Sequence, residues 1–197
     1  GISQGPWTLP SNTAFMTGNQ ACRYYFKKEH NFSLDNSDLN LPEIAKIAGY
    51  KTYFITDHSL MLQQIQGFSK KFDSFIGFPG ASPEKVTKMA LVAADAAKVN
   101  KLFLWLYYTG AHVNYSPELP FSKEFQKDKL YPEHHLPVSK DQKDIFNTIP
   151  NHIVENGITD TAFYKAKYDG AIAVTDSYLG TLFSYLKRNG LYRQTLI

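Results

Sequence analysis

The sequence predicts an α/β fold with a largely parallel sheet and helices on both faces of that sheet. Helical patterns alternate with short apolar runs along the chain, an order that is typical of parallel sheets. Residues 101–108, KLFLWLYY, form the most continuous apolar run and are expected to be a central strand covered on both faces. With 197 residues, of which 43% are hydrophobic, the chain can bury a core and is expected to be one domain over residues 1–197.

The first helix is expected to be short. Ser11 can cap it, Thr17 lies near its end, and Gly18 stops it, which leaves Thr8 and Pro10 in the turn that enters it. A hydroxyl in such a turn lies near backbone N–H groups without helical partners, and these groups bind oxyanions such as phosphate or sulfate. Thr8 is therefore a candidate nucleophile, although local sequence alone favours a capping role for Thr8 and Ser11.

Two further helix-to-strand patterns follow. A helix signal at Asn40 leads to Gly49, and residues 51–56, rich in aromatic and β-branched side chains, are expected to be the next strand. Residues 59–66 are expected to form another short helix. Residues 82–100 have helical spacing of apolar side chains and are expected to form a longer helix before the apolar strand.

Residues 111–158 carry several prolines and many charges without a clear period. So long a connection inside a domain usually lies over a functional face, so this region is interpreted as a lid or substrate-side excursion. A long helix is expected at residues 160–189, with Gly190 as its stop. Residues 195–197 are expected to begin another strand.

Composition excludes several classes of protein. The 21 basic and 18 acidic residues are spread along the chain, which argues against a nucleic-acid-binding surface. Cys22 is the only cysteine, so an internal disulfide is impossible and a thiolate zinc site would need other ligands. No apolar run is long enough for a transmembrane segment. The adjacent Glu133, His134 and His135 are better explained by a solvated loop than by a metal site.

Five segments, in order along the chain, resemble the sulfatase family of the alkaline phosphatase superfamily. Residues 8–18 are similar to the signature Cys/Ser-x-Pro-Ser-Arg and to the Thr-Gly that ends its helix. The other four are residues 41–52 (LPEIAKIAGYKT), 67–78, 103–117 (FLWLYYTGAHVNYSP) and 168–197. The resemblance implies an incomplete sulfatase-like core, and a metal-dependent hydrolase or transferase that acts on sulfate or phosphate esters.

The resemblance also implies roles for individual residues. The family converts its signature Cys or Ser to formylglycine, which Thr8 cannot form, whereas related phosphodiesterases and transferases use a metal-activated threonine. Thr8 is therefore expected to be the nucleophile and a metal ligand in phosphoester chemistry. Ser11 and Asn12, the latter in place of the signature arginine, are expected to contact substrate. His112 matches a family histidine that assists the leaving group, and His58 lies near a family substrate-contact pair.

By the same resemblance, calcium, zinc, magnesium or manganese is expected in the full-length protein, with most ligands outside residues 1–197. This chain alone is then expected to bind the metal weakly or not at all and to be inactive. The implied partner is an anionic ester substrate, and the parent protein is expected to be periplasmic, extracellular or membrane-tethered. The oligomeric state is left open.

Two alternatives remain open from the sequence. One is a true sulfatase whose formylglycine forms at Cys22 or at a serine. The other is a noncatalytic relative that keeps the scaffold as a binding module, because Thr8 and Asn12 both depart from the family signature.

Overall fold

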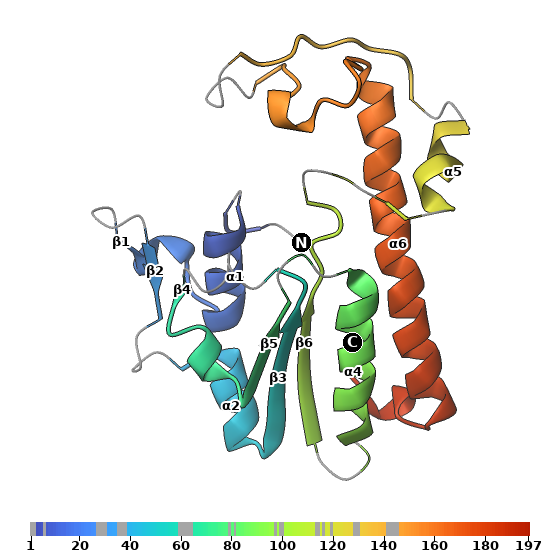
Figure 1. The fold of residues 1–197 in the computed structure, drawn as a ribbon. Coiled ribbons are helices and arrows are strands. Elements are labelled where there is room, and N and C mark those ends of the chain that lie inside the picture. Colours follow the sequence, from blue (N-terminus) through green and yellow to red (C-terminus); the bar gives the residue numbers. More distant parts are fainter. Residues whose placement is uncertain are drawn as a thin grey trace. The chain divides into compact units, whose positions relative to one another are not determined.

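The computed structural model describes residues 3–5, 7–26, 31–34, 39–58, 65–78, 80, 82–96, 98, 101–112, 115, 117–118, 120–127, 131–140 and 146–197. The chain divides into two compact units (Figure 1). Unit 1 comprises Gly1–Tyr108 and Thr181–Ile197, and unit 2 comprises Thr109–Gly180. The excursion expected at residues 111–158 lies within unit 2.

A parallel sheet forms the centre of unit 1. It consists of β3 (Tyr50–Thr56), β5 (Ser74–Gly77) and β6 (Lys101–Tyr107), in the order β5-β3-β6. Both neighbours run parallel to β3. Parallel neighbours need crossover connections, and the intervening α4 (Pro83–Ala96) is one of these. The predicted α/β class and the parallel sheet are confirmed.

A second, smaller sheet was not predicted. It joins β1 (Tyr25–Phe26), β2 (Asn31–Ser33) and β4 (Ile65–Gln66), with β1 antiparallel and β4 parallel to β2. The helix expected at residues 59–66 is thus wrong at its end, because residues 65–66 form β4; residues 59–64 lie outside the described part. The pairing of β2 with β4 joins Phe32 to Ile65, which are far apart in sequence, so local periodicity does not show it.

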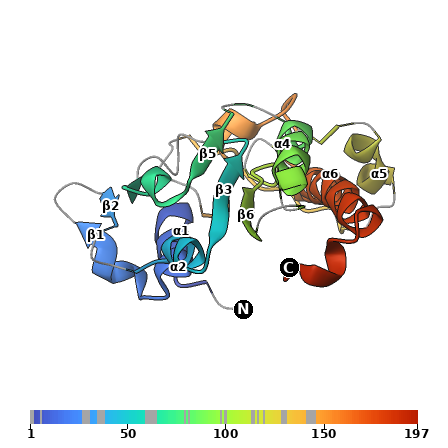
Figure 2. The ribbon, with the colours of Figure 1, turned by 90° about the horizontal axis from the view of Figure 1, so that it is seen from below.

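Helices cover both faces of the parallel sheet. Figure 2 shows α1 (Thr8–Thr17) and α2 (Leu41–Ile47) on one side of the strands and α4 on the other. Unit 2 contains α5 (Phe121–Lys127) and the first part of α6 (Thr161–Arg188). The single-turn helices are η1 (Ala21–Tyr24), η2 (Ser69–Lys71), η3 (Asn151–Ile153) and η4 (Tyr192–Gln194).

α1 begins earlier than the sequence suggests. Its first residue is Thr8 and its N-cap is Trp7, so Ser11 lies inside the helix and does not cap it. Pro10 is the third helical residue, where its missing N–H leaves no helical hydrogen bond unmade. The prediction placed Thr8 and Pro10 in the turn before the helix, which is wrong, because the whole first turn accepts proline. Gly18 ends α1 in a left-handed conformation, as expected.

Two clusters of buried apolar side chains lie on the two faces of the sheet. On the α1 face, Phe54 of β3 packs with Leu9 and Met16 of α1. On the α4 face, the neighbouring Ile55 packs with Val86 of α4. Because successive strand residues point to opposite faces, one strand supplies both clusters. The prediction that the apolar strand is covered on both faces is confirmed for β6, whose side chains join both clusters, although β6 has one strand neighbour in the described sheet.

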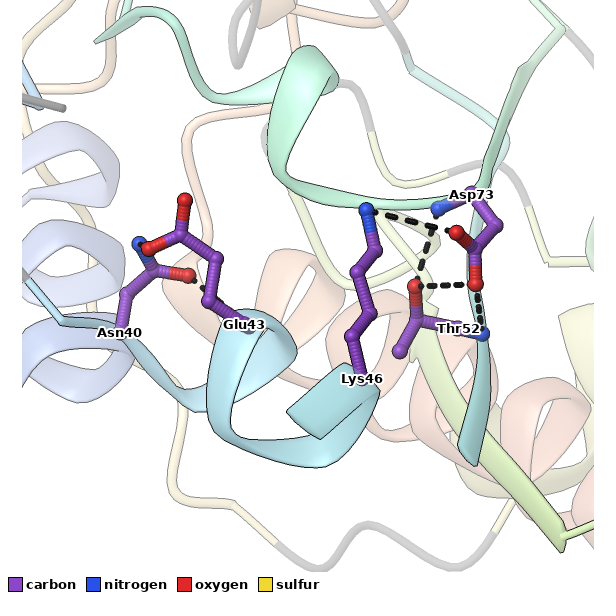
Figure 3. A network of polar contacts seen from close by, with 5 residues as sticks. All are labelled: Asn40, Glu43, Lys46, Thr52 and Asp73. Atoms are coloured by element: carbon purple, nitrogen blue, oxygen red, sulfur yellow. Dashed lines mark hydrogen bonds and ion pairs between the residues drawn. The ribbon is translucent and has the colours of Figure 1, made fainter. Parts of the chain in front are cut away.

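A network of polar contacts links α2 to the amino-terminal ends of β3 and β5 (Figure 3). The Asn40 side chain caps α2 by accepting a hydrogen bond from the Glu43 N–H at 3.2 Å, as the sequence predicts. Asp73, just before β5, accepts from the Thr52 N–H at 2.9 Å and from its hydroxyl at 3.1 Å, and Lys46 lies 3.4 Å away. Although partial burial raises the pKa of Asp73, these hydrogen bonds and Lys46 lower it below its usual value. The network therefore aligns α2, β3 and β5.

α6 ends as predicted, but the strand expected after it is absent from the structure. Gly190 has a φ of 71°, and the Leu191 N–H donates to the Leu186 carbonyl at 2.9 Å, which is a Schellman ending. η4 follows, and residues 195–197 have no strand structure. A strand requires a neighbour for its backbone groups, and no described strand pairs with these residues.

Unit 2 is organised around α6. The α6 residue Gly170 lies close to α5, where an added Cβ would be 2.8 Å from the Phe121 carbonyl oxygen, so only glycine fits. Two isolated bridges, His135 with Asp160 and Val138 with Ile149, join the loop segments before α6. Among the described helices, none is long and apolar enough to cross a membrane.

Candidate functional site

Thr8 lies in a pocket at the carboxyl ends of the strands in unit 1. The pocket has a volume of about 640 Å³ and is lined by Ser3, Gly5, Trp7, Thr8, Ser11, Asn12, Phe15, Trp105 and Tyr107. Thr8 is the first residue of α1 and Tyr107 is the last residue of β6, so the helix start and the strand end meet here. Parallel α/β sheets bind ligands at this edge.

One face of α1 supplies much of the lining. Thr8, Ser11, Asn12 and Phe15 are separated by three, four and seven positions, which places them on the same side of a helix. The structure thus brings together the three signature residues that the sequence singled out in unit 1. Their roles in chemistry stay predictions.

Hydrogen bonds already engage two of these side chains. The Asn12 amide Nδ2 donates to the Thr8 carbonyl oxygen at 2.9 Å, and Asn12 is buried. The Ser11 hydroxyl accepts a hydrogen bond from the Ser3 hydroxyl at 3.0 Å. Asn12 therefore braces the first turn of α1, where the family signature carries an arginine. Its remaining amide oxygen is the atom suited to contact a ligand.

The described lining is uncharged. It offers hydroxyl and amide groups on the α1 side and aromatic rings from Trp7, Phe15, Trp105 and Tyr107. A threonine hydroxyl is a weak nucleophile until a base or a metal removes its proton. None of the described lining residues is a carboxylate, histidine or lysine that could do so. Activation of Thr8 thus requires a group from outside this lining.

The sequence reasoning missed the aromatic walls. Residues 105 and 107 were assigned to the core, yet Trp105 and Tyr107 both line the pocket and also pack against the apolar cluster on the α1 face. The Phe15 ring meets the Trp105 ring edge-on at 5.0 Å. Alternation along β6 could have shown that the two aromatic residues share a face, but contact with α1 is tertiary.

His58 follows the end of β3 and is not among the described residues that line this pocket. Its N–H donates to the Thr56 hydroxyl at 3.0 Å. Its ring Nδ1 is buried and has no hydrogen-bond partner within the described part of the chain. An orphaned imidazole nitrogen at the carboxyl end of the central strand is suited to meet a ligand.

Buried polar side chains also lie on the α4 face of the sheet, near the carboxyl ends of β3 and β6. Asp57 and Thr87 are buried, and the Thr87 hydroxyl lies 2.8 Å from the Tyr108 hydroxyl. Burial and the nearby Asp57 carboxylate raise the pKa of Tyr108, although the bond with Thr87 lowers it. Tyr108 therefore stays a neutral phenol at physiological pH.

His112 belongs to unit 2, whereas Thr8 belongs to unit 1. It is exposed, and its N–H donates to the Thr109 carbonyl at 2.7 Å in a turn just after β6. His112 thus follows the strand expected at residues 101–108, which is an edge strand of the described sheet and not a central one, and its role in catalysis stays a prediction.

The metal expected from the resemblance does not fit the described residues by themselves. No group of three or more His, Cys, Asp or Glu side chains that could hold a metal is found within the described part of the chain. The Glu133 carboxylate lies 2.8 Å from Nε2 of His135, within hydrogen-bond distance, and the other ring nitrogen of His135 lies 2.8 Å from the Thr159 hydroxyl. These exposed contacts organise a loop, and no metal-dependent step follows from the described residues.

Comparison with known families decides the assignment of the fold. The family model described as Sulfatase matches residues 1–197. The chain belongs to the sulfatase family. The five resembling segments are thus parts of one family match over the whole chain, and the predicted family is confirmed. A comparison with curated protein sequences gives no match.

Solved structures with the same fold include two carbohydrate complexes and a synthase. BT4656, in complex with its substrate D-glucosamine-2-N,6-O-disulfate, is 14% identical with a TM-score of 0.66, and the match covers 96% of this chain and 54% of that one. Ps i-CgsB, in complex with k-i-k-neocarrahexaose, is 14% identical with a TM-score of 0.62, covering 96% and 46%. The lipoteichoic acid synthase LtaP from Listeria monocytogenes is 17% identical with a TM-score of 0.57, covering 96% and 42%.

These likenesses show the sulfatase-family fold alone, because the sequence identities are low. This chain spans about half the length of the solved structures that it matches. The activity, substrate and metal of the whole protein therefore do not follow from these likenesses.

Proposed function

We propose that the full-length protein is a metal-dependent hydrolase or transferase of phosphate or sulfate esters, with Thr8 as its nucleophile. The observation that carries the proposal is the position of Thr8. It is the first residue of α1, in an open pocket at the carboxyl ends of parallel strands, within a sulfatase-family fold. That position in the signature segment belongs to the family nucleophile.

The start of α1 provides a place for the transferred anion. The first turn of a helix has backbone N–H groups without helical partners and the positive end of the helix dipole. Thr8 and Leu9 each carry such an N–H, whereas Pro10 has none. Ser11 and Asn12 line the same pocket and are proposed to contact the substrate. His58 and His112 are proposed to contact the substrate and to assist the leaving group.

Charge neutralisation must come from elsewhere, since the described pocket lining carries no charged side chain. A divalent cation such as calcium, zinc, magnesium or manganese supplies Lewis-acid polarisation and lowers the pKa of a bound hydroxyl. We expect residues of the full-length protein outside 1–197 to provide most of its ligands, with the Thr8 hydroxyl as one. The chain alone is then expected to bind such a cation weakly or not at all.

Threonine favours phosphoester over sulfate-ester chemistry here, because it cannot be converted to formylglycine. The alternative site for formylglycine, Cys22, is exposed and is not among the described residues that line the Thr8 pocket. It follows the far end of α1, whose ten residues span about 15 Å. This separation weighs against a nucleophile at Cys22.

The test measures turnover of p-nitrophenyl phosphate, bis-p-nitrophenyl phosphate and p-nitrophenyl sulfate by the full-length protein, after chelation and readdition of each cation. We expect phosphoester turnover that needs the cation, and Thr8→Ala should lower kcat by at least about a thousandfold. Thr175→Ala is the matched control, because the Thr175 hydroxyl only donates to the Ala171 carbonyl within α6. Turnover of the sulfate that survives Thr8→Ala would refute the proposal.

A noncatalytic binding module is the second candidate. It is favoured by the Asn12 amide, which braces the Thr8 carbonyl, and by the uncharged lining. Absence of turnover with every ester and every cation, in a folded full-length protein, would support this candidate instead.

A further inference from the structure

Unit 2 contains a second pocket that the proposed chemistry at Thr8 does not use. Its volume is about 570 Å³, which lies within the usual range for small-molecule sites. One wall comes from the first turns of α6, where Thr161, Tyr164, Lys165, Tyr168 and Asp169 line it. Their spacing of three, four, seven and eight positions places these side chains on one helical face.

The other walls of this pocket are largely apolar and combine two aromatic rings with the aliphatic side chains of Leu136, Ile149, Pro150 and Ile153. Tyr115 and Tyr131, from two separate loop segments, join Tyr164 and Tyr168 in the lining. The Tyr115 and Tyr168 rings meet edge-on at 5.4 Å, and Tyr168 is 41% exposed, so its side chain is accessible to a ligand. Flat C–H faces of a sugar ring stack on such aromatic faces, while phenolic hydroxyls can bond to the hydroxyls at its edge.

One polar atom in the pocket lacks a partner. The Thr161 hydroxyl oxygen is buried and makes no hydrogen bond to the described part of the chain. A buried hydroxyl without a partner costs free energy, so it marks a position where a ligand hydroxyl or a water would bind favourably. A wholly apolar ligand would leave this cost in place.

The described lining of the pocket has one cationic side chain, Lys165, and one anionic side chain, Asp169. Asp169 accepts a hydrogen bond from the Tyr131 hydroxyl at 2.6 Å, and the Lys165 ammonium lies 5.2 Å from the centre of the Tyr131 ring. A carboxylate has two oxygens and accepts several hydrogen bonds, while an ammonium donates three. With one cationic and one anionic side chain in its lining, the pocket favours a neutral ligand with many hydroxyls over a charged one.

We propose that this tyrosine pocket of unit 2, lined by Thr161, Lys165, Tyr168 and Asp169, binds an uncharged sugar ring. The ring stacks against Tyr168, and its hydroxyls bond to Thr161, Lys165 and Asp169. The site stands on contacts within unit 2 and does not depend on catalysis at Thr8.

Saturation-transfer difference NMR on the full-length protein tests the proposal, with the methyl glycosides of glucose, galactose, mannose and N-acetylglucosamine as probes. At least one of them should give a saturable signal. Tyr168→Ala should weaken its binding by about fivefold or more, because the stacking face is lost. Tyr50→Ala is the matched control, since Tyr50 is 39% exposed, close to the 41% of Tyr168, and lies in unit 1. Tyr168→Leu, which keeps apolar volume without an aromatic face, replaces the alanine variant if that variant does not fold.

The variant Thr161→Val separates an effect on sugar binding from an effect on the stability of the fold. This change removes the unpaired hydroxyl at nearly constant volume, so thermal stability should be unchanged or higher while sugar binding weakens by about threefold or more. The proposal is overturned if no glycoside gives a saturable signal, if Tyr168→Ala and Tyr168→Leu bind like the parent protein, or if Thr161→Val lowers stability and leaves binding unchanged. Tighter binding of cyclohexanol or glucose 6-sulfate than of every neutral glycoside would also overturn it.

Discussion

In unit 1, buried apolar side chains pack on both faces of a parallel sheet, whereas polar contacts between loops and α6 are prominent in unit 2. Phe54 and Ile55 illustrate the first arrangement, since each is fully buried in its own cluster. In unit 2, the Tyr164 hydroxyl donates to the Ile158 carbonyl at 2.8 Å, and Asp160 accepts from two backbone N–H groups. Close-packed apolar cores tolerate few substitutions, whereas the sequences of surface loops vary more among related proteins. Core substitutions in unit 1 are thus expected to be more damaging than substitutions in the loops of unit 2.

The largest expected effect is a core truncation in unit 1. Phe54→Ala removes a fully buried ring that contacts Phe68, Phe72, Phe75 and Trp105. It should lower the free energy of unfolding by about 3–5 kcal/mol in urea denaturation. In unit 2, Phe146→Ala, which truncates an exposed side chain, should change the free energy of unfolding by less than about 0.5 kcal/mol. Similar losses from both changes would contradict the contrast between a close-packed core and an open surface.

A smaller effect is expected at the one nearly buried lysine among the described residues of unit 1. The Lys71 side chain is 4% exposed and pairs with Glu43 at 2.9 Å, whereas Glu43 is 31% exposed. Glu43→Gln keeps the backbone N–H that donates to the capping Asn40 side chain but leaves the Lys71 ammonium without a carboxylate, and should cost about 2 kcal/mol in thermal or urea unfolding. Lys71→Met should cost less, because Glu43 can still reach water. An equal or larger loss in Lys71→Met would show that the pair itself is not what matters.

The smallest effect concerns acid stability in unit 2. Hydrogen bonds from the Ala162 and His134 N–H groups lower the pKa of Asp160 below its usual value. A carboxyl whose folded pKa is depressed contributes stability above its unfolded pKa, and this is lost as the pH falls through the folded pKa. Asp160→Asn should therefore reduce thermal stability slightly at pH 7, and the difference from the parent protein should shrink below about pH 4. Asp176→Asn, on the exposed side of α6, controls for the loss of a charge.

Sequence patterns predicted the elements whose signals are local. Asn40 and Gly49 bracket α2, and β3 and β6 are apolar runs of the right length, so these elements were found. The start of α1 was misplaced, because Pro10 is compatible with several first-turn positions. The β4 strand was missed because it exists through pairing with β2.

The candidate site shows the same division. The signature segment singled out Thr8, Ser11 and Asn12, but their shared helical face follows from the earlier start of α1, since Thr8 was expected in the turn before the helix. Contact between α1 and the aromatic residues Trp105 and Tyr107 joins parts of the chain that are far apart in sequence, so no local pattern indicates it. The Thr161 hydroxyl, which has no hydrogen-bond partner among the residues that the structure describes, likewise cannot be recognised from a local pattern.

The central claim is that Thr8 attacks the ester, and trapping the covalent intermediate tests it most directly. The full-length protein is incubated with bis-p-nitrophenyl phosphate and a divalent cation, quenched in acid, digested and analysed by tandem mass spectrometry. The account predicts a phosphoryl adduct on the Thr8 hydroxyl that is absent from Thr8→Ala. An adduct or a formylglycine at Cys22 or at a serine, with Thr8 unmodified during turnover, would contradict it.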